Sequence, residues 1–182
     1  MHCNLGVNEE ERMAALRSYN ILDTPAEDIF DEITRQGAKM CNVPVCAIAL
    51  VDEGRVWFKS IVGMDMPEIP RDCGICSDAI LQPDGTYEIY NTLAEPNHAN
   101  NPLVTGPPNI VFYYAVVLAT PEGLPLGTLC VVDSKPRTLS SHQKTMLKTL
   151  ASQAMTFIRI RKKFTINAKA TNVFVNKEQS VS

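Results

Sequence analysis

Apolar residues recur three and four positions apart in three segments of the chain, which is the spacing of helices that bury one face. The first segment spans residues 9–22 and begins with acidic residues, as the helix dipole favours. The second opens at Thr24, where a hydroxyl, a proline and a glutamate occupy capping positions, and ends at Asn42. The third opens with the capping box of Ser140 and Gln143. The pattern predicts two helices near the N-terminus and one near the C-terminus.

Shorter apolar or alternating runs, bounded by turn residues, predict the strands. They span residues 45–51, 56–62, 86–90, 111–119 and 127–132. Short turns join the first two and the last two, so each of these pairs is expected to form a hairpin. Residues 76–81 suit a short helix, whereas 63–72 and 91–110 read as loops. The predicted fold class is α+β: a central antiparallel sheet of about five or six strands with the terminal helices on one face. The loops and the short helix would then form a ligand pocket on the other face.

The composition fits a core-forming chain. It has 182 residues, of which 45% are hydrophobic, and a formal net charge of -3. These values exclude a disordered chain and a general nucleic-acid-binding chain, and no apolar run is long enough for a membrane span. The size suits one domain with an appendage. We expect a flexible N-terminus over residues 1–7, one domain over 8–163, and a polar, disordered tail over 164–182.

Charge and cysteine usage add to this picture. The C-terminal segment 159–182 is basic although the rest of the chain is acidic. Basic residues at the end of a helix are typical of a solvated terminus, so we expect neither a nucleic acid nor a membrane as partner. The first residues lack the basic start and apolar core of a secretory signal. This pattern predicts a cytoplasmic protein whose six cysteines are mostly reduced thiols.

Seven segments, in order along the chain, resemble a GAF domain. They are 20–25, 50–52, 57–60, 62–65, 70–72, 101–108 and 126–133. The similarity covers roughly residues 8–160 and is to the subgroup found N-terminal to histidine kinases and diguanylate cyclases. The resemblance implies a sensory, regulatory domain that holds a small molecule between sheet and loops, forms a homodimer through its terminal helices and signals to a partner. No output domain follows Phe164 in this chain, so we expect either an excised or truncated sensor module or a chain that acts on a separate effector protein.

The resemblance also implies which residues surround the ligand. They are Trp57, Phe58, Cys76, Asp78, Asn91, Asn101, Tyr113, Tyr114, Cys130 and Asp133. Because adjacent strand residues point to opposite faces, at most one of Trp57 and Phe58 faces the pocket, and the same holds for the two tyrosines. Asp78 stands where the subgroup usually has histidine, and bulkier residues follow Tyr113. The identity of the ligand stays open; no cofactor is assigned, and we expect neither a catalytic nor a metal site.

Two other functions remain open. Cys73 and Cys76 have the spacing of a redox dithiol, and free methionine sulfoxide reductases, which resemble GAF domains, use pocket cysteines. The spacing alone is weak, because a pocket-wall cysteine is the commoner role. The second alternative is a ligand-free interaction module whose pocket is filled by side chains such as Tyr114 and Val116. His98 lies in a polar loop, where we expect it to be solvated.

Overall fold

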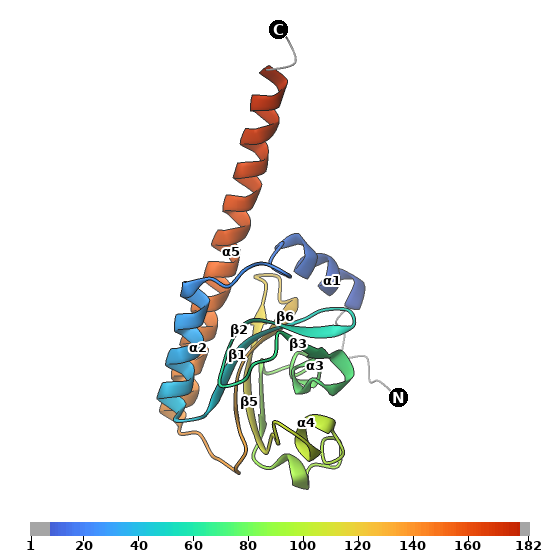
Figure 1. Cartoon of the computed structure of the whole chain (residues 1–182), viewed down its shortest axis with the longest axis vertical. Helices are drawn as coiled ribbons and strands as arrows, with labels where there is room; N and C mark the ends of the chain where they lie inside the picture. Colours follow the sequence, from blue (N-terminus) through green and yellow to red (C-terminus); the bar gives the residue numbers. More distant parts are fainter. Residues whose placement is uncertain (1–7, 179–182) are drawn as a thin grey trace.

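The computed structural model describes residues 8–178, with side chains up to residue 164, and is built around one six-stranded antiparallel sheet (Figure 1). The strands lie in the order β3-β2-β1-β6-β5-β4. Their bounds are β1 Val45–Val51, β2 Arg55–Val62, β3 Glu68–Pro70, β4 Thr86–Ile89, β5 Phe112–Ala119 and β6 Pro125–Asp133. The two expected hairpins are present, since β1 pairs with β2 and β5 with β6. The predicted α+β class is confirmed.

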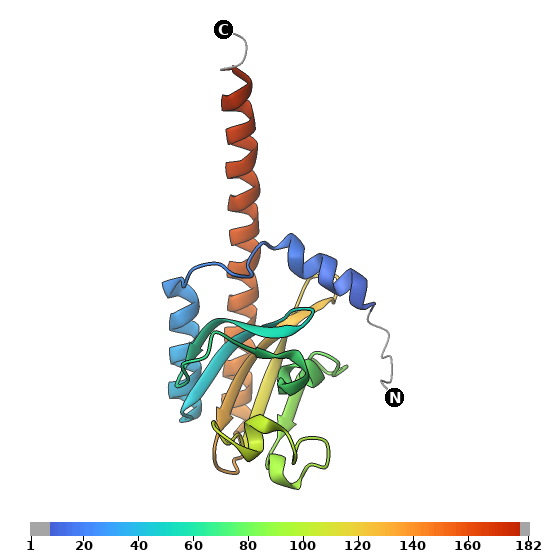
Figure 2. The ribbon, with the colours of Figure 1, turned by 45° about the vertical axis from the view of Figure 1, so that its right-hand side comes forward.

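Helices cover both faces of the sheet. They are α1 Glu9–Ser18, α2 Asp28–Cys41, α3 Ile75–Ala79, α4 Pro102–Thr105 and α5 Ser141–Glu178, with the 3-10 turns η1 Arg71–Cys73 and η2 Thr92–Ala94. The helices α2 and α5 lie side by side over one face, while α3 and α4 lie over the other (Figures 1 and 2). The helix α1 packs against β6, and α5 runs on well beyond the sheet. No helix within residues 8–178 has both the length and the apolar composition needed to cross a bilayer.

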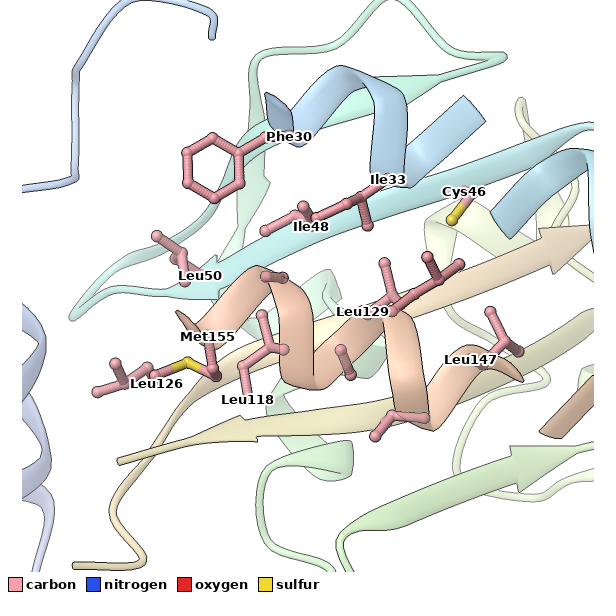
Figure 3. Packing of buried hydrophobic residues seen from close by; sticks show 14 of the residues in the cluster. Phe30, Ile33, Cys46, Ile48, Leu50, Leu118, Leu126, Leu129, Leu147 and Met155 are labelled. Carbon is pink, nitrogen blue, oxygen red and sulfur yellow. The ribbon is translucent and has the colours of Figure 1, made fainter. Parts of the chain in front are cut away.

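The sheet separates two hydrophobic cores, because successive strand residues face opposite sides. We call the cluster beneath α2 and α5 the helix-side core; Ile48, Leu50 and Leu129 of the sheet meet Phe30 and Leu147 there (Figure 3). The cluster beneath α3 and α4 is the loop-side core. Residues Ala47, Ala49 and Cys130 of the same strands belong to it.

The predicted start of the second helix is wrong by several residues. The helix α2 begins at Asp28, and Glu27 is its N-cap residue. The hydroxyl of Thr24 donates instead to the carbonyl oxygen of Ile21, 2.6 Å away, and accepts from the buried Lys59 ammonium at 3.0 Å. The Thr24 side chain, predicted from the local sequence to cap the helix, is instead bound by Lys59 of β2.

Further element bounds differ from the prediction: α1 ends at Ser18 instead of residue 22, and the segment 91–110, predicted as a loop, contains η2 and the short helix α4. The segment 63–72, predicted as a loop, contains β3, whose Ile69 pairs with Val56. This short strand lies at the edge of the sheet, where proline is tolerated because no ladder hydrogen bond is lost on the open side. The backbone of α5 is helical to Glu178, past the residue 164 at which the sequence prediction ended it; no glycine or proline interrupts that stretch.

The capping box of Ser140 and Gln143 is confirmed by both reciprocal hydrogen bonds. Residues 1–7 and 179–182 of the predicted termini lie outside the described residues.

Candidate functional site

A small cavity of about 40 Å³ lies in the loop-side core, between the sheet and the segments that carry α3 and α4. Its lining residues are Val45, Ala47, Phe58, Ile61, Met64, Ile69, Ile75, Cys76, Leu103, Ile110, Tyr113, Cys130 and Val132. No oxygen or nitrogen atom is exposed on this wall, so it is apolar apart from the two thiols. A water molecule in a cavity needs two or more polar partners. The cavity therefore suits a small apolar guest better than water.

The cavity exists because the strands present small side chains to this face. Ala47 and Ala49 of β1 and Ala115 of β5 face the loop-side core, whereas their neighbours Ile48 and Tyr114 face the helix-side core. Small residues leave volume that the covering loops must fill, and close packing is lost where they do not. The long connection 91–110 covers this volume through Leu103 and Ile110, as expected for a segment beside the pocket.

Two cysteines and a tyrosine meet at the wall of the cavity. Cys76, on α3, and Cys130, on β6, are both buried, and the Tyr113 hydroxyl of β5 donates to the Cys76 Sγ at 3.2 Å. A hydrogen bond from the Cys130 thiol lowers the pKa of Cys76 to about 7, although burial opposes this shift. The same bond, together with burial, raises the pKa of Cys130 well above its ordinary value. Cys76 is therefore the more acidic thiol of the pair.

Cys73, the predicted redox partner of Cys76, has a different environment. It is partly exposed, and burial together with the neighbouring Asp72 carboxylate raises its pKa. Its carbonyl oxygen accepts a hydrogen bond of 2.8 Å from the amide of Asn101. The thiol that interacts with Cys76 is that of Cys130, a residue on another element. Sequence spacing indicated Cys73, which is nearer to Cys76 along the chain, because Cys130 approaches Cys76 only in the folded protein.

Four of the residues implied by the resemblance line the cavity, namely Phe58, Cys76, Tyr113 and Cys130. Trp57 and Tyr114 lie on the opposite side, in the helix-side core, as strand alternation requires. Tyr114 and Val116 both pack beneath the helices, so the expectation that they fill the pocket is wrong. The bulkier residues that follow Tyr113 leave the cavity open because alternation turns them away from it.

The remaining predicted polar residues cap helices or form ion pairs outside the cavity. Asn91 caps η2 by accepting from the Leu93 amide, and Asn101 caps α4 by accepting from Leu103. The buried Asp133 forms an ion pair with Arg137. The side chain of Asp78 is 55% exposed. None of these four lines the cavity, and none is brought next to another one.

A buried histidine beside this site was missed. His98 is only 3% exposed, so the expectation that it is solvated is wrong. Its Nε2 lies 3.1 Å from the Tyr87 hydroxyl and 3.8 Å from an Asp78 carboxylate oxygen. Tyr87 in turn meets Tyr113 edge to face, with ring centroids 6.2 Å apart. A histidine inside a polar segment carries no sequence signal of burial, because tertiary contacts alone create it.

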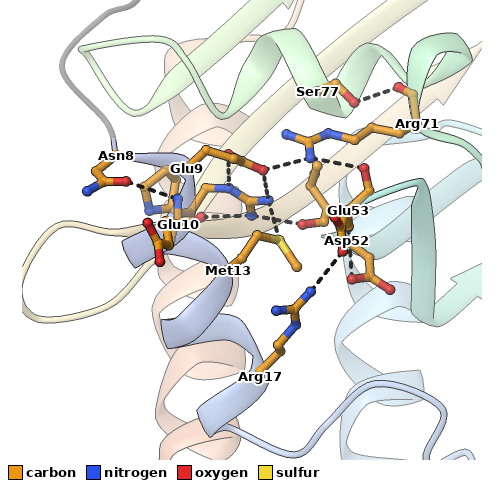
Figure 4. A network of polar contacts seen from close by, with 12 residues as sticks. Asn8, Glu9, Glu10, Met13, Arg17, Asp52, Glu53, Arg71 and Ser77 are labelled. Atoms are coloured by element: carbon orange, nitrogen blue, oxygen red, sulfur yellow. Dashed lines mark hydrogen bonds and ion pairs between the residues drawn. The ribbon is translucent and has the colours of Figure 1, made fainter.

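A series of polar contacts links α3 to α1 (Figure 4). The Ser77 hydroxyl on α3 donates to the Arg71 carbonyl oxygen at 2.7 Å, and the Arg71 guanidinium donates to Glu9 at 2.7 Å. Glu9 also accepts two hydrogen bonds from the fully buried Arg12, at 2.7 and 2.8 Å. These bonds, with that of Arg12 the strongest, lower the pKa of Glu9 to about 2 against the effect of burial. Arg12 further donates to the Val51 carbonyl oxygen at 2.8 Å.

A second set of contacts joins α5 to the segment between α1 and α2. Arg161 donates to the Asn20 carbonyl oxygen at 2.7 Å and to the Glu27 carboxylate at 3.1 Å. Lys162 donates to the Ser18 hydroxyl at 2.8 Å. These contacts lie where α5 leaves the sheet. Among the described residues, no group of three or more histidine, cysteine or acidic side chains is arranged to hold a metal ion.

Comparison with known proteins agrees with this geometry. The model of the GAF domain family matches residues 25–158. A cyclic di-GMP phosphodiesterase of Pseudomonas aeruginosa is 35% identical over 149 residues, which are 81% of this chain and 25% of that protein. The chain thus spans about a quarter of the length of this relative.

Solved structures share the fold. The GAF domain of an Acinetobacter phosphoenolpyruvate-protein phosphotransferase aligns with a TM-score of 0.59 at 18% identity, over 83% of this chain and 92% of that one. A type II free methionine-R-sulfoxide reductase from Thermoplasma acidophilum aligns with a TM-score of 0.52 at 18% identity, over 72% and 95%. With the family match across most of the domain, these findings lead to one conclusion: the chain belongs to the GAF domain family.

Proposed function

We propose that this GAF domain is a sensory, regulatory module that binds a small apolar molecule in the loop-side cavity and is not itself an enzyme. The observation that carries the proposal is the apolar cavity on the face opposite α2 and α5, lined by α3, the 91–110 connection and the sheet. Concave sites with a mainly apolar lining and a few polar groups are the usual form of small-molecule sites. The phosphodiesterase activity named for the relative belongs to a longer protein, of which this chain matches one quarter.

The lining limits the class of ligand. No lysine or arginine lines the cavity, so the charge of a nucleotide would have no partner there. The Tyr113 hydroxyl donates to Cys76 and exposes no surface to the cavity, so the wall offers a guest no oxygen or nitrogen partner. The best-fitting ligand is a neutral molecule of a few heavy atoms. A larger guest requires displacement of Leu103 or Ile110, both from the 91–110 connection.

The polar contacts supply a route from the cavity to α5. A guest that shifts α3 also shifts Ser77, and through it the pairing of Arg71 with Glu9 on α1. The segment after α1 contacts Arg161 and Lys162 of α5. A ligand changes this arrangement only by the difference in its affinity for the two states. The output is then a change in the position of α5.

We further propose that α5 presents this output to a second copy of the chain or to a separate effector, in the cytoplasm. Ile160 and Phe164 are 41% and 71% exposed and stand one helical turn apart beyond the sheet. An exposed apolar pair on a helix that extends beyond the sheet suits contact with another helix. Light scattering at high concentration is expected to show a dimer that Phe164→Glu weakens; a strict monomer for the unsubstituted chain would count against dimerisation.

The ligand proposal is tested by native mass spectrometry of the protein purified from its own cells. We expect a small molecule to remain bound to the unsubstituted chain and to be lost from Ala47→Val, because the added methyl groups enter the cavity. Ala26→Leu, which alters an exposed alanine, is the control and should retain it. The absence of any bound molecule, or equal retention in both variants, would contradict a ligand in this cavity.

A further inference from the structure

Two buried thiols lie together in the loop-side core although they are far apart in the sequence. Cys76 belongs to α3 and Cys130 to the central strand β6, and each is 4% exposed. Both line the same cavity, and each thiol shifts the pKa of the other.

The two sulfur atoms are not equivalent. Cys76 accepts the hydrogen bond of the Tyr113 hydroxyl at 3.2 Å, and a hydrogen bond from the Cys130 thiol lowers its pKa. Both donors stabilise an anionic sulfur at Cys76. The interaction with Cys76 and burial both raise the pKa of Cys130, and they outweigh the opposite effect of a hydrogen bond with Thr128, so Cys130 stays protonated. One thiol is thus prepared as a nucleophile and the other as its partner.

We propose that Cys76 and Cys130 form an oxidisable dithiol that reacts with a small neutral hydroperoxide admitted to the cavity and closes to a disulfide between α3 and β6. The cavity of about 40 Å³ exceeds the roughly 10–15 Å³ that one water molecule needs, so a small hydroperoxide fits in it. This inference uses the same cavity but does not depend on the ligand proposed above, because the reacting groups belong to the protein.

The chemistry balances in two steps. The Cys76 sulfur attacks the terminal peroxide oxygen and the O–O bond breaks; the departing oxygen takes the proton of the Cys76 thiol and leaves as an alcohol or water. Cys76 is then a sulfenic acid. In the second step the Cys130 sulfur attacks the Cys76 sulfur, the S–S bond forms and the S–O bond breaks, and the hydroxide leaves as water with the Cys130 proton. The dithiol loses two electrons and the peroxide gains them.

The chain offers its own control in Cys73, three positions before Cys76. Cys73 is the more accessible of the two, yet its pKa is raised by burial and by Asp72. If exposure alone decided the reaction, Cys73 would be oxidised first. If the environment decides it, Cys76 reacts first.

The experiment treats the folded chain with a small alkyl hydroperoxide, ethyl hydroperoxide, and maps the peptides under non-reducing conditions. We expect a disulfide that joins the peptide of Cys76 to that of Cys130, also in Cys73→Ser. In Cys130→Ser the reaction should stop at a sulfenic acid on Cys76, which dimedone captures. The rate should rise with pH through about 7, where Cys76 becomes a thiolate. Tyr113→Phe should slow the first step by about tenfold, because it removes a hydrogen bond to the anionic sulfur.

The contrary results are equally definite. A disulfide between Cys73 and Cys76, or faster oxidation of Cys73 than of Cys76, would overturn the assignment. So would a fully reduced Cys76 after Cys73 has been consumed. Far-UV circular dichroism shows whether each variant is folded, and the peptide map of the unsubstituted chain decides the question if a variant is not.

Discussion

The two faces of the sheet are built from the same strands but packed in opposite ways. On the helix side, large residues such as Ile48 and Leu129 meet α2 and α5. On the loop side, the small Ala47 borders a cavity, and the thiols of Cys76 and Cys130 line it. The difference teaches that residue size, more than polarity, distinguishes the face with a candidate site. One face secures the fold, and the other keeps volume that a guest can use.

The elements that cover the two faces of the sheet also differ in regularity. The helix side is covered by α2 and α5, which are long and regular, whereas the loop side is covered by α3, α4 and irregular segments. Irregular segments can change conformation at lower cost than a packed helix, because fewer buried contacts are lost. A sensory function needs such a face, and stability needs the other.

The largest expected difference between the faces comes from one pair of phenylalanines. Phe30→Ala in the helix-side core should lower the free energy of unfolding by about 3–5 kcal/mol, because it opens a cavity in close packing. Phe58→Ala should cost only about 1–2 kcal/mol, because Phe58 is partly exposed and already borders empty volume. Urea unfolding of the two variants measures both values. Equal losses would show that the two faces are packed alike.

Substitutions that enlarge a side chain also compare the packing of the two faces. A Cβ at Gly37, on α2, would lie 2.7 Å from the Cys46 Sγ. Gly37→Ala should therefore destabilise by about 1–2 kcal/mol, since overpacking outweighs the gain in helix propensity. Ala47→Val on the loop side should change the free energy of unfolding by less than about 1 kcal/mol, because the cavity accepts the extra methyl groups. Thermal or urea unfolding distinguishes them, and a more severe loss from Ala47→Val would reverse the comparison.

A smaller effect, the pH dependence of stability, tests the pairing of Arg71 with Glu9 of α1. The pKa of Glu9 is lowered to about 2 in the folded chain, from an ordinary value of 4.5. Its ionised form therefore stabilises the fold above about pH 4.5, and this stabilisation is lost as the pH falls toward 2. We expect a loss on the order of 1 kcal/mol, because the half-exposed carboxylate is screened by solvent.

The matched control for this effect is Glu9→Gln, which cannot titrate. The difference in free energy of unfolding between the two chains should shrink as the pH falls through this range. A difference that does not depend on pH would mean that the pairing of Glu9 with Arg12 and Arg71 contributes nothing to stability.

Much of the fold could be predicted because its signals are local. The capping box of Ser140 and Gln143, the hairpins and the alternation of Trp57 with Phe58 each depend on residues a few positions apart. The start of α2 could not be predicted, because the Thr24 hydroxyl is taken by Lys59 from another element. Local patterns fail where a distant residue competes for the same group.

The candidate site shows the same division. Alternation and resemblance indicated Phe58, Cys76, Tyr113 and Cys130 for the cavity wall. The interaction of Cys76 with Cys130 could not be predicted from the sequence, because it requires α3 to lie over β6. The burial of His98 was equally hidden, since Tyr87 and Asp78 approach it only in the folded chain.

The most direct test of the difference between the faces is the methyl NMR spectrum of the unsubstituted chain under xenon pressure, because xenon enters apolar cavities and avoids close-packed cores. We predict shifts of the methyl signals of Ala47, Ile110 and Val132, which line the cavity, and unchanged signals of Leu129 and Leu147 in the helix-side core. Shifts confined to the helix-side residues, or no shift on either face, would contradict an accessible cavity on the loop side.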